Sequence, residues 1–218
     1  MYAVYLVTNR HVFDGVKTAV LRFNPEAAEP AKQYSVPLLT PDGPSAWVGH
    51  PDPEVDVVVL PVNAGALRND GMKFHIFQDD EHAATRARMA ELGVTEGDGV
   101  FALGFPMGLV GGDRNYVIVR QGALARVRDT LAGASKDFLV DSAVFPGNSG
   151  GPVVLRPEIA AIDGTKAQNS AQLLGIVSGY LPYQDVAVSA QTKRPRIIFE
   201  ENTGLGGGRG NRRCGAPA

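Results

Sequence analysis

The sequence of 218 residues contains a single cysteine, Cys214, and this scarcity excludes two kinds of protein. One thiol cannot form a disulfide within the chain, and it cannot supply the several thiolate ligands of a cysteine-rich zinc site. A lone cysteine is more typical of a bacterial or cytosolic protein than of a secreted domain held together by disulfides.

The sequence also lacks long apolar runs. No stretch of about 18 apolar residues is present, so no membrane-spanning helix and no membrane partner are expected. The start, MYAVYLVTNRHV, has neither the basic region nor the apolar stretch of a signal peptide. A cytoplasmic location is therefore expected if the chain is complete as given.

Neither sign of charge predominates in the sequence. Twenty-one basic and 23 acidic residues give a formal net charge of −2, so nucleic acid is not expected as a partner. The sequence shows no cluster of metal-ligating residues and no phosphate-binding loop, so no cofactor is implied.

Glycine and proline are abundant instead. With 26 and 15 residues they make up about 19% of the chain, whereas ~12% is usual. Many turns imply many short strands, which argues against a helix bundle. Hydrophobic residues at 44% and charged residues at 20% are typical of a globular domain.

Short apolar or alternating runs between turn residues predict an all-β fold. The predicted strands cover residues 2–8, 17–23, 32–38, 46–49, 55–62, 100–105, 115–127, 138–141, 152–155, 173–178 and 196–199. One helix is predicted over residues 81–92, with Asp79 or Asp80 as its N-terminal cap and Gly93 as its stop.

These elements suggest a first β unit over residues 1–64, a connector with a helix over residues 65–96, and a second β unit over residues 97–202. The last segment, residues 203–218, contains six glycines and three arginines and shows neither helix nor strand periodicity. Its composition predicts a disordered tail.

The run DSAVFPGNSGGP (residues 141–152) is the most informative part of the sequence. It surrounds Ser149 with Gly147, Gly150 and Gly151. A nucleophilic serine needs a sharp turn that presents its hydroxyl and aims backbone N–H groups at a developing oxyanion, and glycine permits such a turn. The alternative is a glycine-rich hairpin with an incidental serine.

A nucleophilic serine needs a base, and the chain has four histidines: His11, His50, His75 and His82. His11 is the strongest candidate because it directly follows a predicted strand. His50 precedes a proline in a turn, His75 lies in the connector, and His82 lies on the predicted helix.

The base in turn needs a carboxylate that fixes its orientation. Asp56 stands at the start of an apolar strand, where an unpaired carboxylate would be costly, so a polar partner is implied. A strand-initiating aspartate that faces water is the alternative. Asp52 and Glu54 are rivals, but turn prolines flank them.

Four segments together resemble the trypsin/chymotrypsin-like serine proteases. They are TNRHV (residues 8–12), DVVVLPV (56–62), DSAVFPGNSGGPVV (141–154) and LLGIVSG (173–179). The likeness is greatest to the bacterial Htr/Deg branch, although no PDZ-like region follows. The resemblance implies two β-barrels with the active site in the cleft between them. Only one predicted strand precedes His11, and the glycine/arginine run replaces the usual ending, so the first barrel and the C-terminal end are expected to be incomplete.

The resemblance also implies roles for individual residues. His11 would be the general base, Asp56 would orient it, and Ser149 would be the nucleophile that forms an acyl-enzyme. The N–H groups of Gly147 and Ser149 would form the oxyanion hole. Asn148 would shape the loop without taking part in the reaction.

Substrate-binding residues follow from the same alignment. Ala143 would lie at the base of the specificity pocket, which predicts small or medium apolar residues before the cleaved bond (P1). Ser178, Gly179 and Tyr180 belong to the strand that pairs with an extended polypeptide substrate, and Ser178 would also support the triad aspartate.

The sequence thus predicts a serine endopeptidase. The alternatives are a degenerate protease that acts as a peptide-binding module with little turnover, and a non-peptide esterase. The oligomeric state is left open.

Overall fold

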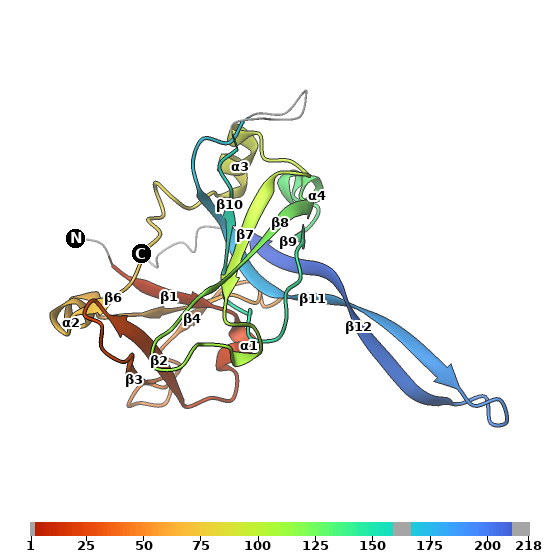
Figure 1. The fold of residues 1–218 in the computed structure, drawn as a ribbon, viewed down its shortest axis with the longest axis horizontal. Coiled ribbons are helices and arrows are strands. Elements are labelled where there is room, and N and C mark those ends of the chain that lie inside the picture. Colours follow the sequence, from red (N-terminus) through yellow and green to blue (C-terminus); the bar gives the residue numbers. More distant parts are fainter. Residues whose placement is uncertain (1–2, 159–166, 211–218) are drawn as a thin grey trace.

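The chain folds mostly into β-strands, as the computed structural model shows for residues 3–158 and 167–210 (Figure 1). The strands are β1 (Tyr5–Thr8), β2 (Thr18–Pro25), β3 (Lys32–Pro37), β4 (Val48–Gly49), β5 (Val58–Pro61), β6 (Met72–Lys73), β7 (Gly99–Gly104), β8 (Ile118–Arg126), β9 (Asp137–Asp141), β10 (Pro152–Leu155), β11 (Gln172–Val188) and β12 (Pro195–Gly210). The short helices are α1 (Arg10–Phe13), α2 (Ala64–Asn69), α3 (Arg86–Leu92), α4 (Arg128–Ala132) and the 3-10 turn η1 (Pro106–Gly108). The prediction of an all-β fold is confirmed.

Six strands form a closed barrel in the order β10-β11-β12-β9-β8-β7, with antiparallel pairing between neighbours. Its interior is filled by apolar side chains from β7, β8, β9, β10 and β11, because inward and outward positions alternate along a strand. The completely buried ones include Val100, Ala102, Phe138, Val140, Val153, Leu155 and Leu174.

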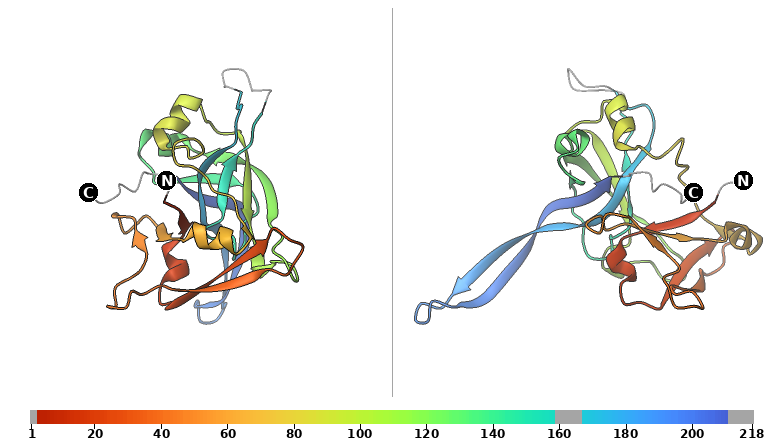
Figure 2. Two further views of the ribbon diagram at one scale, coloured as in Figure 1. Left: turned by 90° about the vertical axis from the view of Figure 1, so that its left-hand side faces the viewer. Right: turned by 180° about the vertical axis from the view of Figure 1, so that it is seen from behind.

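The N-terminal part forms two three-stranded sheets, β1-β5-β4 and β3-β2-β6. Their shared core is small and is built around Phe13, Leu38, Val58 and Leu60. Within the described residues these two sheets do not close into a second barrel. Figure 2 shows them beside the closed barrel.

The expectations of an incomplete C-terminal end and of a tail disordered from residue 203 are wrong as far as residue 210. Strand β12 continues through this glycine/arginine run, and Leu205–Arg209 pair with β9 to close the barrel. The remaining residues of the predicted tail, 211–218, lie outside the described residues.

Packing explains why a strand here is rich in glycine. A β-carbon at Gly208 would lie 2.3 Å from the Phe138 ring, and one at Gly206 would lie 2.8 Å from Val144. Both contacts are shorter than real β-carbons make, so only glycine lets the strand pass over these two buried side chains. The composition reflects close approach of the backbone and not disorder.

Strands β11 and β12 are also much longer than the sequence predicts. Beyond the pair Tyr180–Gly206 they leave the barrel and continue as a two-stranded ribbon that projects from the body (Figures 1 and 2). We call residues 181–203 the arm. Its register runs from Pro182 opposite Asn202 to Val188 opposite Pro195.

The connector contains two helices. Helix α3 begins at Arg86 and not at residue 81, because the side chain of Thr85 caps it by accepting a hydrogen bond from the Arg88 N–H. Gly93 ends it in the left-handed conformation, as predicted. Helix α2 was not predicted, and Asn63 caps it. No helix in the described part of the chain is long and apolar enough to span a membrane.

A loop of the C-terminal half holds the two halves together. Between η1 and β8, the Arg114 guanidinium donates to the carbonyls of Pro25 and Ala27. The next residue, Asn115, exchanges hydrogen bonds with Asn24 in both directions. The loop is thereby fixed against the β3-β2-β6 sheet.

Candidate active site

Helix α1 presents His11 at the surface. Phe13, at the end of the same helix, is buried and packs with Trp47 at 6.3 Å between ring centroids. Arg10 donates to the His50 carbonyl at 3.1 Å and lies against Gly49. With these two neighbours anchored to the N-terminal sheets, the His11 side chain points outward and is 51% exposed.

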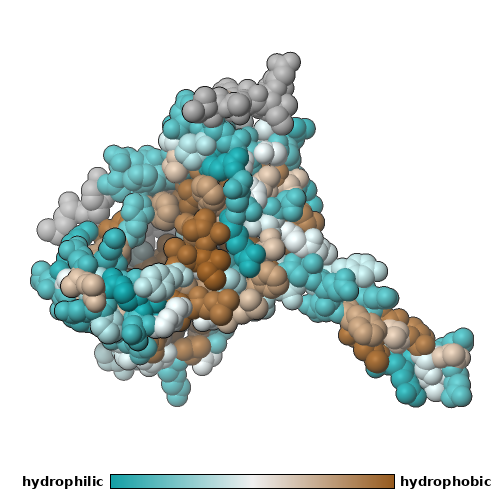
Figure 3. All heavy atoms as spheres, viewed as in Figure 1, coloured by the Kyte–Doolittle hydropathy of each residue, from teal (hydrophilic) through white to brown (hydrophobic). Residues whose placement is uncertain are grey.

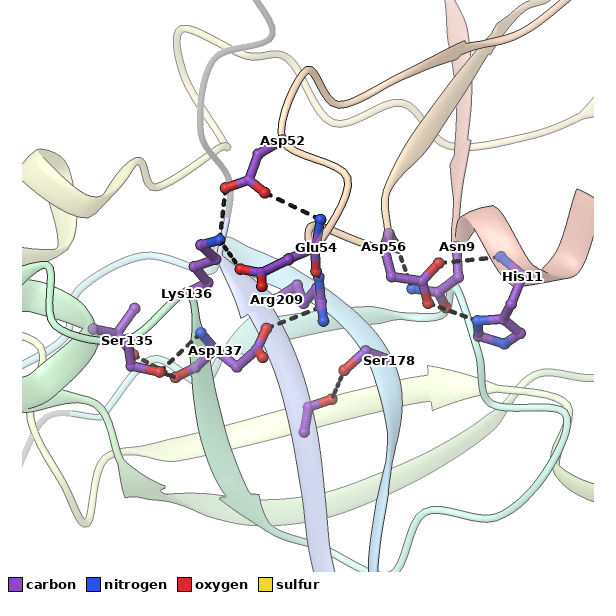
Figure 4. Close-up of polar contacts among 12 residues, drawn as sticks. Asn9, His11, Asp52, Glu54, Asp56, Ser135, Lys136, Asp137, Ser178 and Arg209 are labelled. Carbon is purple, nitrogen blue, oxygen red and sulfur yellow. Dashed lines mark hydrogen bonds and ion pairs between the residues drawn. The ribbon is translucent and has the colours of Figure 1, made fainter. Parts of the chain in front are cut away.

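Asp56 holds His11 by two hydrogen bonds (Figure 4). One carboxylate oxygen lies 2.6 Å from His11 Nδ1, and the other accepts from the His11 backbone N–H at 3.1 Å. The Asp56 side chain is only 25% exposed. Two contacts to one carboxylate fix both the position of the helix turn and the plane of the imidazole ring.

This contact also decides the tautomer of His11. An ionised carboxylate only accepts hydrogen bonds, so the hydrogen of a neutral His11 ring resides on Nδ1. The lone pair is then on Nε2, the ring nitrogen on the side away from Asp56. A histidine arranged in this way can take a proton from a substrate or a nucleophile.

The turn that carries Ser149 packs tightly on the end of β7 and on η1. A β-carbon at Gly151 would lie 2.1 Å from the Leu103 carbonyl oxygen, and one at Gly147 would lie 2.7 Å from that of Phe105. Gly147 also has a φ of +94°, which favours glycine. Asn148 is fully buried, and its side-chain oxygen accepts from the Phe145 N–H, a contact that agrees with its predicted loop-shaping role.

The other side of the turn rests on β1. A β-carbon at Gly150 would lie 2.4 Å from Thr8 Oγ1 and 3.2 Å from Thr8 Cα. Gly150 is the neighbour of Ser149, and Thr8 stands three residues before His11. The structure therefore brings the Ser149 turn against the end of β1, just before the helix α1 that carries His11. In the described part of the chain, His11 is hydrogen-bonded to Asp56 and not to the Ser149 hydroxyl.

The backbone of the turn has a fixed orientation. The Met107 N–H donates to the Pro146 carbonyl at 2.6 Å, and the Gly150 N–H donates to the Val177 carbonyl at 2.9 Å. Because the N–H and C=O of a trans peptide point in opposite directions, the Gly147 N–H points away from η1. Met107 itself has a φ of 54°, a rare conformation for a residue with a side chain.

The predicted substrate-binding residues lie along β11 and the start of the serine loop. Ala143 is exposed, whereas Val144 is buried at 1% beside Gly206. Tyr180 packs against the barrel core and donates its hydroxyl hydrogen to Glu200 at 2.9 Å. Gly179 has open space around the position of a β-carbon.

Ser178 does not support Asp56 through a hydrogen bond. Its hydroxyl donates to the Gly207 carbonyl at 3.0 Å, as Figure 4 shows. The aspartate is held instead by Asn9, whose fully buried side chain donates to the Asp56 carbonyl at 2.8 Å. The sequence analysis did not single out Asn9, although the residue belongs to the TNRHV segment.

A charged cluster fixes the loop that leads to Asp56. Lys136 forms ion pairs with Asp52 and Glu54, and its hydrogen bond is the main reason that the pKa of Asp52 is lowered. Arg209 donates to the Glu54 carbonyl and pairs with Asp137 at 2.9 Å. Asp52 and Glu54 are therefore engaged in this cluster and not with His11. Arg209 lies in the run that composition assigned to a tail.

The other three histidines make local contacts. His50 accepts a hydrogen bond from the Asp52 N–H, and His82 accepts one from the Gln78 N–H. His75 packs edge-on against Phe77. Within the described residues, no group of three or more His, Cys, Asp or Glu side chains is arranged to hold a metal ion.

Comparison with known families agrees with this geometry. Residues 2–158, more than two thirds of the chain, match the model of the trypsin-like peptidase domain. The chain therefore belongs to this family, and the resemblance seen in the sequence is confirmed. No curated protein sequence matches the chain closely enough to count as a relative.

Three solved protease structures show similarity to this chain. The serine endoprotease from Yersinia pestis has 18% identity and a TM-score of 0.43, with 94% of this chain and 49% of that chain covered. An HtrA-type protease, AlgW, solved with a tripeptide, has 21% identity and a TM-score of 0.42, with 95% and 50% covered. The MamO protease domain from Magnetospirillum magneticum has 15% identity and a TM-score of 0.43, with 91% and 78% covered. The chain spans about half the length of the first two.

Proposed function

We propose that the chain is a serine endopeptidase that cleaves polypeptides through an acyl-enzyme. The observation that carries this proposal is the pairing of His11 with Asp56 at 2.6 Å next to a glycine-rich turn bearing Ser149. The turn and the histidine come from different halves of the chain, and the close approach of Gly150 to Thr8, three residues before His11, supports their acting together. Family membership supports the same activity.

The reaction follows from the hydrogen-bonding roles of the three side chains. His11 Nε2 takes the proton of the Ser149 hydroxyl as the oxygen attacks the scissile carbonyl carbon. Asp56 stabilises the imidazolium that forms. The imidazolium then gives its proton to the leaving amine, and an acyl-enzyme remains. A water molecule, deprotonated by His11, hydrolyses the ester and returns Ser149 to its starting state.

The oxyanion of each tetrahedral intermediate would be bound by the N–H groups of Gly147 and Ser149. The hydrogen bond from the Met107 N–H to the Pro146 carbonyl supports this role. It orients the Pro146–Gly147 peptide so that the Gly147 N–H points away from η1. Donors that are fixed in advance stabilise the developing charge without reorganisation, and the loss of one typically costs ~10²–10³ in rate.

The proposed specificity is for small or medium apolar P1 residues. The loop from Ala143 to Phe145 presents no carboxylate that could pair with a lysine or arginine side chain, and a buried unpaired ammonium would be costly. Val144 fills the space beside Gly206 and limits the depth available to a side chain.

Labelling with a fluorophosphonate tests the catalytic proposal, because the reagent reacts only with an activated serine. We expect stoichiometric labelling of the wild type and none of Ser149→Ala or His11→Ala. In a peptide-cleavage assay each variant should lose activity by about 10⁴-fold or more, and the double variant should be little worse than either. Losses that multiply would show that the two residues do not act in one step.

A folded protein that binds peptides but is not labelled would contradict the endopeptidase and favour the peptide-binding module. A peptide library then tests specificity. Dominant cleavage after lysine or arginine would show that the pocket does not lie at Ala143 and Val144.

A further inference from the structure

The arm is an isolated two-stranded ribbon with apolar side chains on both faces. Ile197, Ile198 and Phe199 are 54%, 62% and 52% exposed, and Figure 3 shows the apolar surface on the arm, far from the body. A two-stranded ribbon on its own is only marginally stable in water. A ribbon of this kind gains stability when further strands cover it.

The outer edge of β12 is open along the arm. Strand β12 pairs with β11 over the whole ribbon, but it pairs with β9 only at Leu205–Arg209. Along residues 195–202 its other edge therefore has no strand partner among the described residues. Such an edge presents a row of backbone donors and acceptors to another strand.

The sequence of this edge is complementary to itself. It reads Arg-Ile-Ile-Phe-Glu over residues 196–200. If a second copy runs antiparallel and the pairing is centred on Ile198, Arg196 lies opposite Glu200 of the second copy. Ile197 then lies opposite Phe199 of that copy. Both kinds of cross-strand pair are favourable, and the two-fold symmetry makes each of them twice.

We propose that two copies of the chain associate through this edge and form a four-stranded sheet with the strand order β11-β12-β12-β11. The occupant of the edge is thus a second copy of the same chain. The proposal does not depend on the proposed function.

The charged side chains favour the β12 edge of the arm over the β11 edge as the interface. Arg196 is exposed, and among the described residues its side chain makes no hydrogen bond or ion pair. The Glu200 carboxylate accepts from Tyr180 and Gln184 and has lone pairs left for a guanidinium. The β11 edge, YQDVAV over residues 183–188, carries one charge and has no such symmetry.

The shape of the molecule permits this pairing. The arm projects clear of the body in Figure 1 and in the right view of Figure 2, which leaves room for a second arm alongside it. The base of one arm then lies beside the tip of the other, and the two barrels stand at opposite ends of the shared sheet. Because two ribbons bury less surface than a large permanent interface, we expect a reversible dimer.

Sedimentation velocity of the full chain over a concentration series tests the association. Arg196→Glu and Glu200→Arg each place like charges opposite one another, and each should weaken dimerisation by about tenfold or more. The double variant R196E/E200R restores opposite charges across the interface and should recover the dimer. Within one copy the two positions are four residues apart, about 13 Å along the strand, so they cannot rescue each other there.

Lys17→Glu is the matched control, because it reverses an exposed charge away from the arm and should leave the dimer unchanged. A wild type that is monomeric at every concentration, or a dimer insensitive to both single variants, would overturn the proposal. A double variant that is weaker than either single one would do the same.

Cysteine trapping tests the register independently. In a Cys214→Ser background, Ile198→Cys places two thiols across the symmetry axis, where the Cα separation of ~4.5–5.5 Å suits a disulfide. Mild oxidation should give a covalent dimer. Val186→Cys is the control, since Val186 lies opposite Ile198 within the arm but on β11. Trapping at position 186 and not at 198 would show that the β11 edge is the interface and would refute the proposal.

Discussion

Gly208 provides the sharpest test of how the barrel closes. The strand that contains it crosses directly over the Phe138 ring, and a β-carbon at this position would lie 2.3, 2.4 and 3.0 Å from three atoms of the ring. Phe138 is completely buried and cannot move without displacing its neighbours. We therefore predict that Gly208→Ala destabilises the protein.

The magnitude follows from the cost of overpacking. Forcing one extra carbon into a filled core typically costs ~1–3 kcal/mol. For a chain of this size that corresponds to a fall in Tm of about 2–12 °C. Thermal unfolding followed by circular dichroism, together with urea titration, measures both quantities.

Two further variants separate the clash from a general effect of alanine. Gly179→Ala, on the neighbouring strand, meets open space and should change stability by less than about 1 kcal/mol. Phe138→Leu removes ring atoms, so the pair Gly208→Ala and Phe138→Leu should show a coupling of ~0.5–3 kcal/mol in which the second change offsets part of the first. If Gly208→Ala is as stable as the wild type, β12 does not pass over Phe138 and the barrel is closed in another way.

Three other changes have definite outcomes. Asp56→Asn should lower the rate of peptide cleavage by about 10⁴-fold while the fold is kept, because the amide favours the wrong tautomer of His11; steady-state kinetics would contradict this if the rate fell less than tenfold. Burial opposes ionisation of Glu96, but hydrogen bonds from the backbone of Val127 and Arg128 and the charge of Arg128 outweigh it and bring its pKa from 4.5 to about 2. Its folded pKa is depressed, so its contribution is present above pH 4.5 and is lost as the pH falls towards 2; Glu96→Gln should be less stable than the wild type at pH 7 and equal to it near pH 2 in denaturant titrations, and a constant gap would contradict the linkage. Hydrogen exchange should be faster in β2 and β3 than in β9 and β10, because the N-terminal sheets share a much smaller buried core; equal protection would show that the two halves unfold together.

Local patterns predicted most strands of this fold. Alternating apolar and polar residues located β3 and β7 within about one residue, and a short apolar run located β10, in which Val153, Val154 and Leu155 are all buried. The glycine/arginine run could not be read in this way. Gly208 and Gly206 are required by Phe138 and Val144, which lie 70 and 62 residues away in the chain, and local composition cannot reveal such distant neighbours.

In the candidate active site, too, local patterns predicted some residues and missed others. The glycine pattern around Ser149 and the position of His11 after a strand pointed to the two residues, and the structure places their segments together. Asp56 was preferred over Asp52 and Glu54 from its place at a strand, and it is the carboxylate that contacts His11. The sequence does not predict that Asn9 and Arg209 hold the segment around Asp56. Their partners, the carbonyls of Asp56 and Glu54, are distant in the chain and come within reach only when the protein folds.

The position of β12 in the barrel has a consequence for the order of synthesis. This strand lies between β9 and β11, both made before it, and its Arg209 reaches the loop that leads to Asp56. While the chain is emerging from the ribosome, the barrel therefore stays open and that loop stays loose until residue 209 is available. Closure of the barrel and anchoring of the Asp56 loop therefore both depend on one of the last strands of the described chain.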